Sequence, residues 1–255
     1  MSEIIYDNLT LCASEESEGY TVCGCDKSAV RVSIPEYIDG KPVIAIGDGA
    51  FEDCTELASV SFPDYGDDFF INGYSFDSVG DGAFSNCVSL TEIELPYSVG
   101  FIGRSAFYGC RELKEISGFC PETYIAPYAF AGCVSLKRVP KLKLISEGCF
   151  SECHSLEYAP IADNCKEIGE DSFQHCYALS EVRIPASVTE IGPLAFRSCR
   201  GLKTVKFESP EGWCWRSVYK PGDFELDLSD PTCNAEWLSR MDFDDGVMGL
   251  YRKGN

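Results

Sequence analysis

A phenylalanine that recurs at a nearly fixed spacing is the feature of this sequence that most restricts its fold. Seven such anchor phenylalanines are separated by 33, 23, 23, 20, 23 and 23 positions. Three residues after each anchor stands a cysteine, six after it a leucine, and five before it an isoleucine or valine. A repeat of this length predicts a solenoid, because each unit buries its apolar face only against its neighbours. The anchors are Phe51, Phe84, Phe107, Phe130, Phe150, Phe173 and Phe196.

Each repeat combines two hydrophobic periods. Its end alternates apolar and polar residues, as in Val182-Arg-Ile184, which predicts a short strand that ends at Pro185. The stretch from Gly169 to Leu179 instead places apolar residues three apart, which favours a helical turn, including the tighter 3₁₀ kind. We therefore expect the strands of successive repeats to stack into a parallel sheet on the concave side.

The phrase Ile-Gly-x-x-Ala-Phe-x-x-Cys-x-x-Leu-x-x-Val-x-Ile-Pro resembles the BspA-like leucine-rich repeat of bacterial surface antigens. The lead-in from Ile34 to Val43 and, more weakly, the tail from Asp230 to Leu238 are also similar to such proteins. The resemblance implies an α/β solenoid, a right-handed leucine-rich repeat superhelix with a short parallel concave sheet, about seven 23-residue repeats and a cap at both ends. It also implies a protein-binding or adhesive surface, and it brings no catalytic residues.

The first 29 residues do not fit the repeat. Two short strands, Ile4 to Cys12 and Tyr20 to Cys25, are predicted there and would form an N-terminal β cap over residues 1–29. The solenoid is expected to span residues 30–207, with an insertion at 64–78 that accounts for the longest spacing.

The repeat pattern also stops before the C-terminus, so residues 208–255 are expected to form a second cap with one helix. Asp230-Pro231 is a favourable helix start, with Asp as the cap and Pro in the first turn, and the helix should reach about Met241 and bury Trp237 and Leu238. Strands are predicted from Trp213 to Tyr219 and from Val247 to Arg252.

The charge balance restricts the partners of the chain. The sequence has 21 basic and 41 acidic residues, a formal net charge of −20, which disfavours non-specific binding to nucleic acid or anionic membranes. No apolar run is long enough to span a bilayer. The N-terminus lacks the features of a secretory signal, so we expect a cytoplasmic protein as the chain stands, and a surface or secreted one if the native chain is longer.

The chain has fifteen cysteines, of which seven occupy the repeat position three residues after an anchor. That position favours a small buried side chain, so we expect a ladder of reduced thiols in the core. The spacing of stacked strands does not exclude disulfides between rungs, but parallel Cβ directions disfavour them. Cys23-Gly-Cys25 is too close for the usual zinc pair.

No motif for catalysis, a cofactor or a metal stands out. His154 and His175 flank ladder cysteines; they are expected on the surface, with a general base or a ligand as the alternative. Neither a nucleophile elbow nor a phosphate loop is present. The insertion carries several acidic residues, but their order does not match a calcium loop; they are Asp64, Asp67, Asp68 and Asp77, together with Asn72.

Two further groups are open to either a structural or a binding interpretation. The aromatic residues of the insertion either fold back into the protein or form a contact patch for a partner. They are Phe69, Phe70, Tyr74 and Phe76. The basic cluster is either a solvated face or a contact for an acidic partner. It consists of Lys137, Arg138, Lys141 and Lys143.

The sequence therefore favours a non-enzymatic, monomeric recognition module for an unknown protein or peptide. A secreted or surface-displayed adhesin is the second hypothesis, and an enzyme is the third. The side chains eight and ten residues after each anchor should point outward from the concave sheet, with Tyr158 as the expected hot spot. The candidate partner-binding residues are Glu92, Glu94, Glu115, Arg138, Tyr158, Glu181, Arg183 and Lys206.

Overall fold

The fold is described from a computed structural model of the chain. It describes residues 3–13, 19–63, 76–217, 223–240 and 247–253. The chain divides into two compact units, Met1–Cys133 and Val134–Asn255, and each is built from stacked coils. The predicted boundaries between caps and solenoid, at 29/30 and 207/208, stay predictions.

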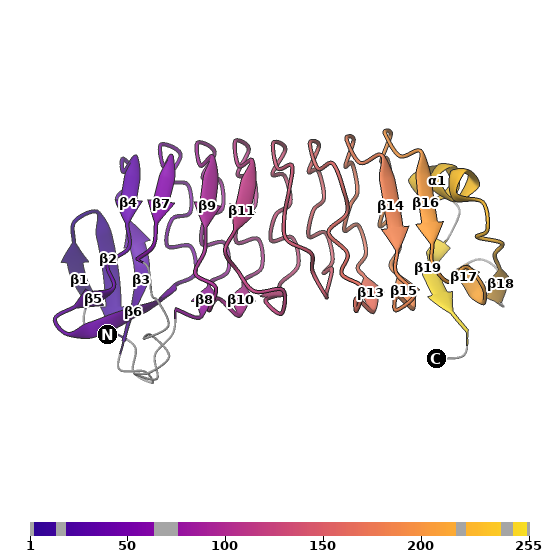
Figure 1. Cartoon of the computed structure of the whole chain (residues 1–255). Coiled ribbons are helices and arrows are strands. Elements are labelled where there is room, and N and C mark those ends of the chain that lie inside the picture. Colours follow the sequence, from indigo (N-terminus) through magenta and orange to yellow (C-terminus); the bar gives the residue numbers. More distant parts are fainter. Residues whose placement is uncertain (1–2, 14–18, 64–75, 218–222, 241–246, 254–255) are drawn as a thin grey trace. The chain divides into compact units, whose positions relative to one another are not determined.

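The first unit contains an eight-stranded sheet that is antiparallel at its N-terminal end and parallel along the coils (Figure 1). Strand β5 pairs with β6 and lies off the main path. The sequence predicted one strand from Ile4 to Cys12, but Asp7 adopts a positive φ of 53° and the segment forms two antiparallel strands. The strands are β1 (Glu3–Tyr6), β2 (Leu9–Ala13), β3 (Tyr20–Cys25), β5 (Tyr37–Ile38), β6 (Lys41–Ile46), β8 (Ser78–Val79), β10 (Phe101–Ile102) and β12 (Tyr124–Ile125).

A second row of strands in this unit lies at the position where the sequence predicted the concave sheet. Strand β4 pairs with β7 and β9 pairs with β11, in parallel register, on the opposite side of the coils from β8 and β10 (Figure 1). Their middle residues are buried and their outer residues point to solvent, as the alternation predicted. The strands are β4 (Arg31–Ser33), β7 (Ser59–Ser61), β9 (Glu92–Glu94) and β11 (Glu115–Ser117).

The second unit repeats the arrangement with a five-stranded sheet and one strand pair. The pair, β14 with β16, is parallel, and the sheet has the order β13-β15-β19-β17-β18. Predicted strands near Trp213 and Val247 are confirmed, whereas β18 was not predicted. The strands are β13 (Glu167–Ile168), β14 (Glu181–Ile184), β15 (Glu190–Ile191), β16 (Thr204–Phe207), β17 (Trp213–Ser217), β18 (Asp223–Glu225) and β19 (Val247–Arg252).

The predicted helix is present as α1 (Pro231–Arg240). The Asp230 carboxylate accepts hydrogen bonds from the backbone N–H groups of Thr232 and Cys233, at 2.8 and 3.2 Å, and so caps the helix. Leu238 is buried as expected, but Trp237 is only half-buried. The buried Asn234 side chain donates 3.1 Å to the Val205 carbonyl and so attaches the helix to β16.

The anchor phenylalanines form the centre of both units, as predicted. Every anchor is at most 1% exposed, and within each unit neighbouring rings stack nearly parallel. Within the first unit the centroids of Phe51 and Phe84 are 4.8 Å apart, and within the second those of Phe150 and Phe173 are 5.6 Å apart. The repeat spacing therefore identified the core correctly.

The predicted helical turn around each anchor does not form. The residues two before and two after every anchor have positive φ, for example Gly49 at 59° and Asp53 at 57° around Phe51. This left-handed backbone interrupts any right-handed helix. Every second backbone N–H donates to the carbonyl three residues earlier, as Cys54 does to Phe51. The N–H groups between them donate to carbonyls of the next coil, as Phe51 does to Ala83 at 2.7 Å.

The concave sheet is also less continuous than predicted. Strands were expected at Arg138–Pro140 and Tyr158–Pro160, but no strand is assigned at either place among the described residues. Proline has no N–H to contribute to a ladder, so Pro140 and Pro160 weaken pairing there. A single bridge, Leu142 with Ile161, joins these two coils nearby.

Candidate partner-binding surface

Three glutamates form an acidic strip on the first unit: Glu92 and Glu94 on β9, and Glu115 on β11. All three are exposed, while Ile93 between the first two is 3% exposed. The register places Glu92 directly beside Glu115, so their Cα atoms are about 4.8 Å apart, as in any parallel pair. None of the three forms an ion pair with another described residue.

The strands before the acidic strip carry polar side chains, most of them small. Ser59 and Ser61 on β7 are partly or fully exposed, and β7 lies beside β9 (Figure 1). Arg31 and Ser33 on β4 are exposed in register with them. The side chains directly beside the strip are therefore small, and Arg31 lies one strand further away.

On the second unit, the predicted positive charge of Arg183 is already neutralised. Its guanidinium lies 2.6 Å from the carboxylate of Asp163 and 2.6 Å from that of Glu208. The hydrogen bond from Arg183 holds the pKa of Asp163 below its ordinary value. Lys206, its neighbour in register, and Glu181 are exposed and remain available to a partner.

Tyr158 and Arg138 are exposed as predicted, although neither lies on a strand. The Tyr158 ring is 39% exposed, and its hydroxyl donates a 3.0 Å hydrogen bond to the Val139 carbonyl. This bond fixes the ring, which lowers the entropy lost if a partner packs on it.

The insertion was the second candidate surface. One of its aromatic residues is too deeply buried to contact a partner. Phe76 is fully buried and meets Phe62 edge to face, with centroids 5.1 Å apart, so it cannot form a contact patch. Phe69, Phe70 and Tyr74 lie outside the described residues. Of the possible calcium ligands only Asp77 is described, and within the described ranges no three acidic, histidine or cysteine side chains are grouped to hold a metal.

The sequence did not predict that one group of side chains on the second unit would form an aromatic cluster. His154 stacks on Tyr177 with centroids 4.6 Å apart, His175 lies edge-on at 5.9 Å, and Arg200 lies over the ring at 5.6 Å. His154, Tyr177 and Arg200 each follow a ladder cysteine directly, so the repeat spacing contained the signal.

The cysteine ladder is reduced, as predicted. All seven ladder cysteines are free and buried. The Cys87, Cys110 and Cys133 thiols each donate about 3.1 Å to the carbonyl of the anchor phenylalanine one coil earlier. Burial raises the pKa of Cys199 to about 12, which keeps its thiol neutral.

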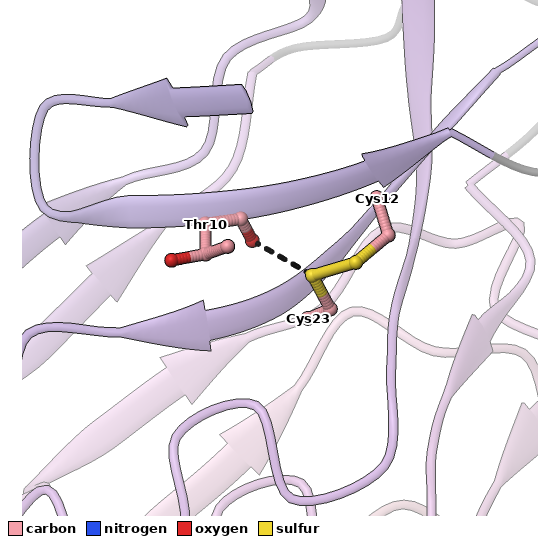
Figure 2. The surroundings of a disulfide bond; sticks show 3 residues. All are labelled: Thr10, Cys12 and Cys23. Carbon is pink, nitrogen blue, oxygen red and sulfur yellow. Dashed lines mark hydrogen bonds between the residues drawn. A yellow bond between two sulfur atoms is a disulfide. The ribbon is translucent and has the colours of Figure 1, made fainter. Parts of the chain in front are cut away.

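A disulfide joins Cys12 on β2 to Cys23 on β3 (Figure 2). The sequence did not predict it. The two strands pair antiparallel with a bulge after Thr10, whose carbonyl oxygen lies 3.5 Å from the Cys23 sulfur. The bulge shifts the register, and the register decides which cysteines meet.

The profile of one protein family, the BspA type leucine rich repeat region, matches residues 31–140 and 121–211 in six copies. The chain belongs to the BspA-type leucine-rich repeat family. Repeats of this type are a non-enzymatic fold. Among the described residues, no helix is long and apolar enough to cross a membrane.

Two solved structures of leucine-rich repeat proteins are similar to this BspA-type chain. One is a leucine rich cell surface protein from Faecalibacterium prausnitzii A2-165, 28% identical with a TM-score of 0.69, over 84% of this chain and 56% of that one. This chain thus spans just over half of that protein's length. The other is the leucine rich repeat protein of T. pallidum, 27% identical with a TM-score of 0.55, over 81% of this chain and 84% of that one. No curated protein matches.

Proposed function

We propose that this protein is a non-enzymatic recognition module that binds a protein or peptide on the exposed faces of its repeat strands. The observation that carries the proposal is the acidic strip of Glu92, Glu94 and Glu115. Like charges directly opposite on neighbouring strands destabilise a sheet, and no described residue neutralises them.

A partner with lysine or arginine side chains would relieve this repulsion. The strip is well suited to such contacts, because β9 and β11 are held from beneath by the buried Ile93 and Ile116. Rigid strands fix the spacing of the carboxylates, so little backbone entropy is lost on binding. Complementary charge also speeds association and selects the partner.

The second unit offers a different contact surface in this proposal. Tyr158 supplies a fixed, partly exposed ring, and aromatic residues of this kind are frequent hot spots. Arg138, Glu181 and Lys206 supply exposed charges of both signs. Arg183 contributes less than the sequence suggested, since Asp163 and Glu208 already pair with it.

The binding test compares three immobilised proteins: the parent, the strip variant Glu92→Gln/Glu94→Gln/Glu115→Gln, and a control, Glu152→Gln/Glu157→Gln/Glu211→Gln. Both variants lose the same charge, and the control glutamates are also exposed. Proteins captured from cell extract and from extracellular matrix are identified by mass spectrometry. We expect a partner whose retention falls at least about tenfold, near 1.4 kcal/mol, only with the strip variant. Equal retention by all three proteins would exclude the strip.

We further propose that the protein is displayed on the cell surface. The Cys12–Cys23 disulfide supports this setting, because such bonds persist mainly in oxidising compartments. The similar cell surface protein of Faecalibacterium prausnitzii supports it as well. Protease treatment of intact host cells should release peptides of this chain. If the peptides appear only after lysis, the protein is cytoplasmic.

A further inference from the structure

We propose that the last coil of the second unit carries a further binding surface, which takes a short acidic peptide segment. Its basic row consists of Arg200, Lys203 and Lys206, and the guanidinium of Arg200 lies over the ring of Tyr177. This surface has the opposite charge to the acidic strip and does not depend on it.

The basic row is unusual for this chain, because no acidic residue stands between its charges. Residues 197–206 include four basic residues and no acidic ones, in a sequence with 41 acidic and 21 basic residues. An earlier coil has bases at two of the same repeat positions, but a glutamate follows each of them, in Arg111-Glu112 and Lys114-Glu115. In the last coil the corresponding residues are glycine and threonine, so its positive charge is not offset along the coil.

The charges of the basic row are free for a partner. All three side chains are exposed, and none of them forms an ion pair with another described residue. Glu208, two residues after the row, is already paired with Arg183. Helix α1 packs against β16, but its Glu236 is already paired with Arg240. The carboxylates that follow the row in the sequence and on the helix therefore leave its charge available.

An aromatic ring holds Arg200 in place. The guanidinium carbon lies 5.6 Å from the centre of the Tyr177 ring, on which His154 also stacks at 4.6 Å. A cation–π contact uses none of the N–H donors of a guanidinium, so Arg200 can still bind a carboxylate through two parallel hydrogen bonds. Because the ring and the guanidinium are ordered before binding, less side-chain entropy is lost when a partner arrives.

The size and the surroundings of the row favour a short peptide over a long anionic polymer. Three residues of chain span at most about 10 Å, so acidic residues three apart in an extended peptide can reach successive members of the row. The neighbouring strand β14 presents the exposed Glu181 in register with Thr204. A polymer charged along its whole length would meet this carboxylate and the net charge of −20 beyond the row. A peptide with a few acidic residues, and an apolar one for the partly exposed Tyr177 ring, avoids both.

The test measures, by isothermal titration calorimetry, the binding of a synthetic peptide of about twelve residues with an aspartate at every third position. A matched peptide has asparagine in place of each aspartate. The row variant Arg200→Gln/Lys203→Gln is compared with the parent and with the control Arg111→Gln/Lys114→Gln, which loses the same charges at the same repeat positions. We expect the parent and the control to bind the acidic peptide alike, and the row variant to bind it at least about tenfold more weakly. The parent should also bind the asparagine peptide at least about tenfold more weakly.

Tyr177→Leu tests the contribution of the ring. It removes the cation–π contact and should weaken binding of the acidic peptide about two- to fivefold. An unchanged affinity would contradict the role of the ring in holding Arg200. Circular dichroism melting curves like that of the parent show that the variants fold.

The strip variant Glu92→Gln/Glu94→Gln/Glu115→Gln separates this surface from the acidic strip, because it should bind the acidic peptide at least as tightly as the parent. A failure of one surface therefore leaves the other standing. The proposal is overturned if the row and control variants lose affinity equally, or if the parent binds neither peptide or both alike. It is also overturned if heparin, a sulfated polysaccharide, binds the parent more tightly than the peptide does and loses that affinity in the row variant.

Discussion

Phe173 and Phe196 stack with their ring centroids 5.3 Å apart and their planes 9° apart. Both rings are buried, and the Phe173 N–H also donates 2.8 Å to the carbonyl of Ala195. The side-chain stack and the backbone bond thus join the same two coils. Because packing and hydrogen bonding coincide at Phe173, loss of its ring should weaken the contacts of its coil with both neighbouring coils.

Phe173→Ala should lower the free energy of unfolding by about 3–5 kcal/mol, since it leaves a cavity between stacked rings. Urea unfolding followed by circular dichroism measures the loss. Phe101→Ala is the control, because that ring is 39% exposed and should cost less than about 1.5 kcal/mol. Equal losses in the two variants would contradict the anchor role.

Arg183→Gln should lower the melting temperature at pH 7 and much less at pH 2.5. Arg183 holds the pKa of Asp163 below its ordinary 3.8, so folding favours the charged carboxylate. The resulting contribution to the free energy of unfolding is complete at pH values above 3.8. It is lost as the pH falls through the lower pKa that Asp163 has in the folded protein. Lys206→Gln, at the neighbouring register position, is the control. If the difference in melting temperature between the two variants is the same at both pH values, the pairing with Asp163 is not responsible for it.

The ladder thiols should react slowly with a thiol reagent at pH 8 until the protein unfolds. Burial raises the pKa of Cys199 to about 12, so its thiolate is scarce in the folded state. Exposed Cys233 should react first and serves as the internal reference. Labelling with and without denaturant, resolved by peptide mass mapping, measures both. Rapid labelling of Cys176 or Cys199 in the native protein would be inconsistent with a closed core.

Deletion of residues 208–255 should cause aggregation. Strand β19 pairs with β15 through Ile191 and Leu250, and its removal exposes a strand edge, which invites pairing with another chain. Light scattering and size-exclusion chromatography detect the change. Arg240→Ala, on the exposed side of α1, should remain like the parent. A truncated protein that stays monomeric with the parent's melting curve would mean that these residues do not protect the coils.

Ser105→Gly should be at least about 1 kcal/mol more favourable to stability than Ser180→Gly. Ser105 has φ of 54°, where an ordinary side chain costs about 1–2 kcal/mol and glycine costs none. Ser180 does not have a positive φ, so glycine there only adds unfolded-state entropy. Paired denaturant titrations compare the variants. The strain argument fails if both substitutions destabilise equally.

Much of the fold could be predicted from the repeat because burial follows sequence position directly. Phe173, Cys176 and Val182 are buried where the spacing placed them. The turn was wrong because apolar residues three apart fit both a helix and a chain with left-handed residues at two fixed places. His175, with φ of 62°, gave no sign of this, since it is neither glycine nor asparagine.

The candidate site was predictable only as far as the strand pattern reached. Glu92 and Glu115 are exposed side by side because alternation and repeat length together set their positions. The ion pairs of Arg183 could not be predicted from the sequence, because its partners Asp163 and Glu208 come from different coils. Pro140 and Pro160 did carry the signal for the broken strand row, as proline cannot donate to a ladder.

The hydrogen bond from the N–H of an anchor phenylalanine to the following coil also bears on how such a chain can grow. Phe51 donates to Ala83 and Phe84 donates to Ala106, so each coil presents the acceptors that another coil needs. A gene duplication that inserts one whole repeat would find donors, acceptors, rings and thiols already in register. The spacings of 33 and 20 residues show that the connections between anchors can vary in length, whereas a residue added between an anchor and its cysteine would misplace the ring or the thiol. Selection can therefore lengthen the solenoid in whole coils, and vary its exposed residues, without redesigning the interior.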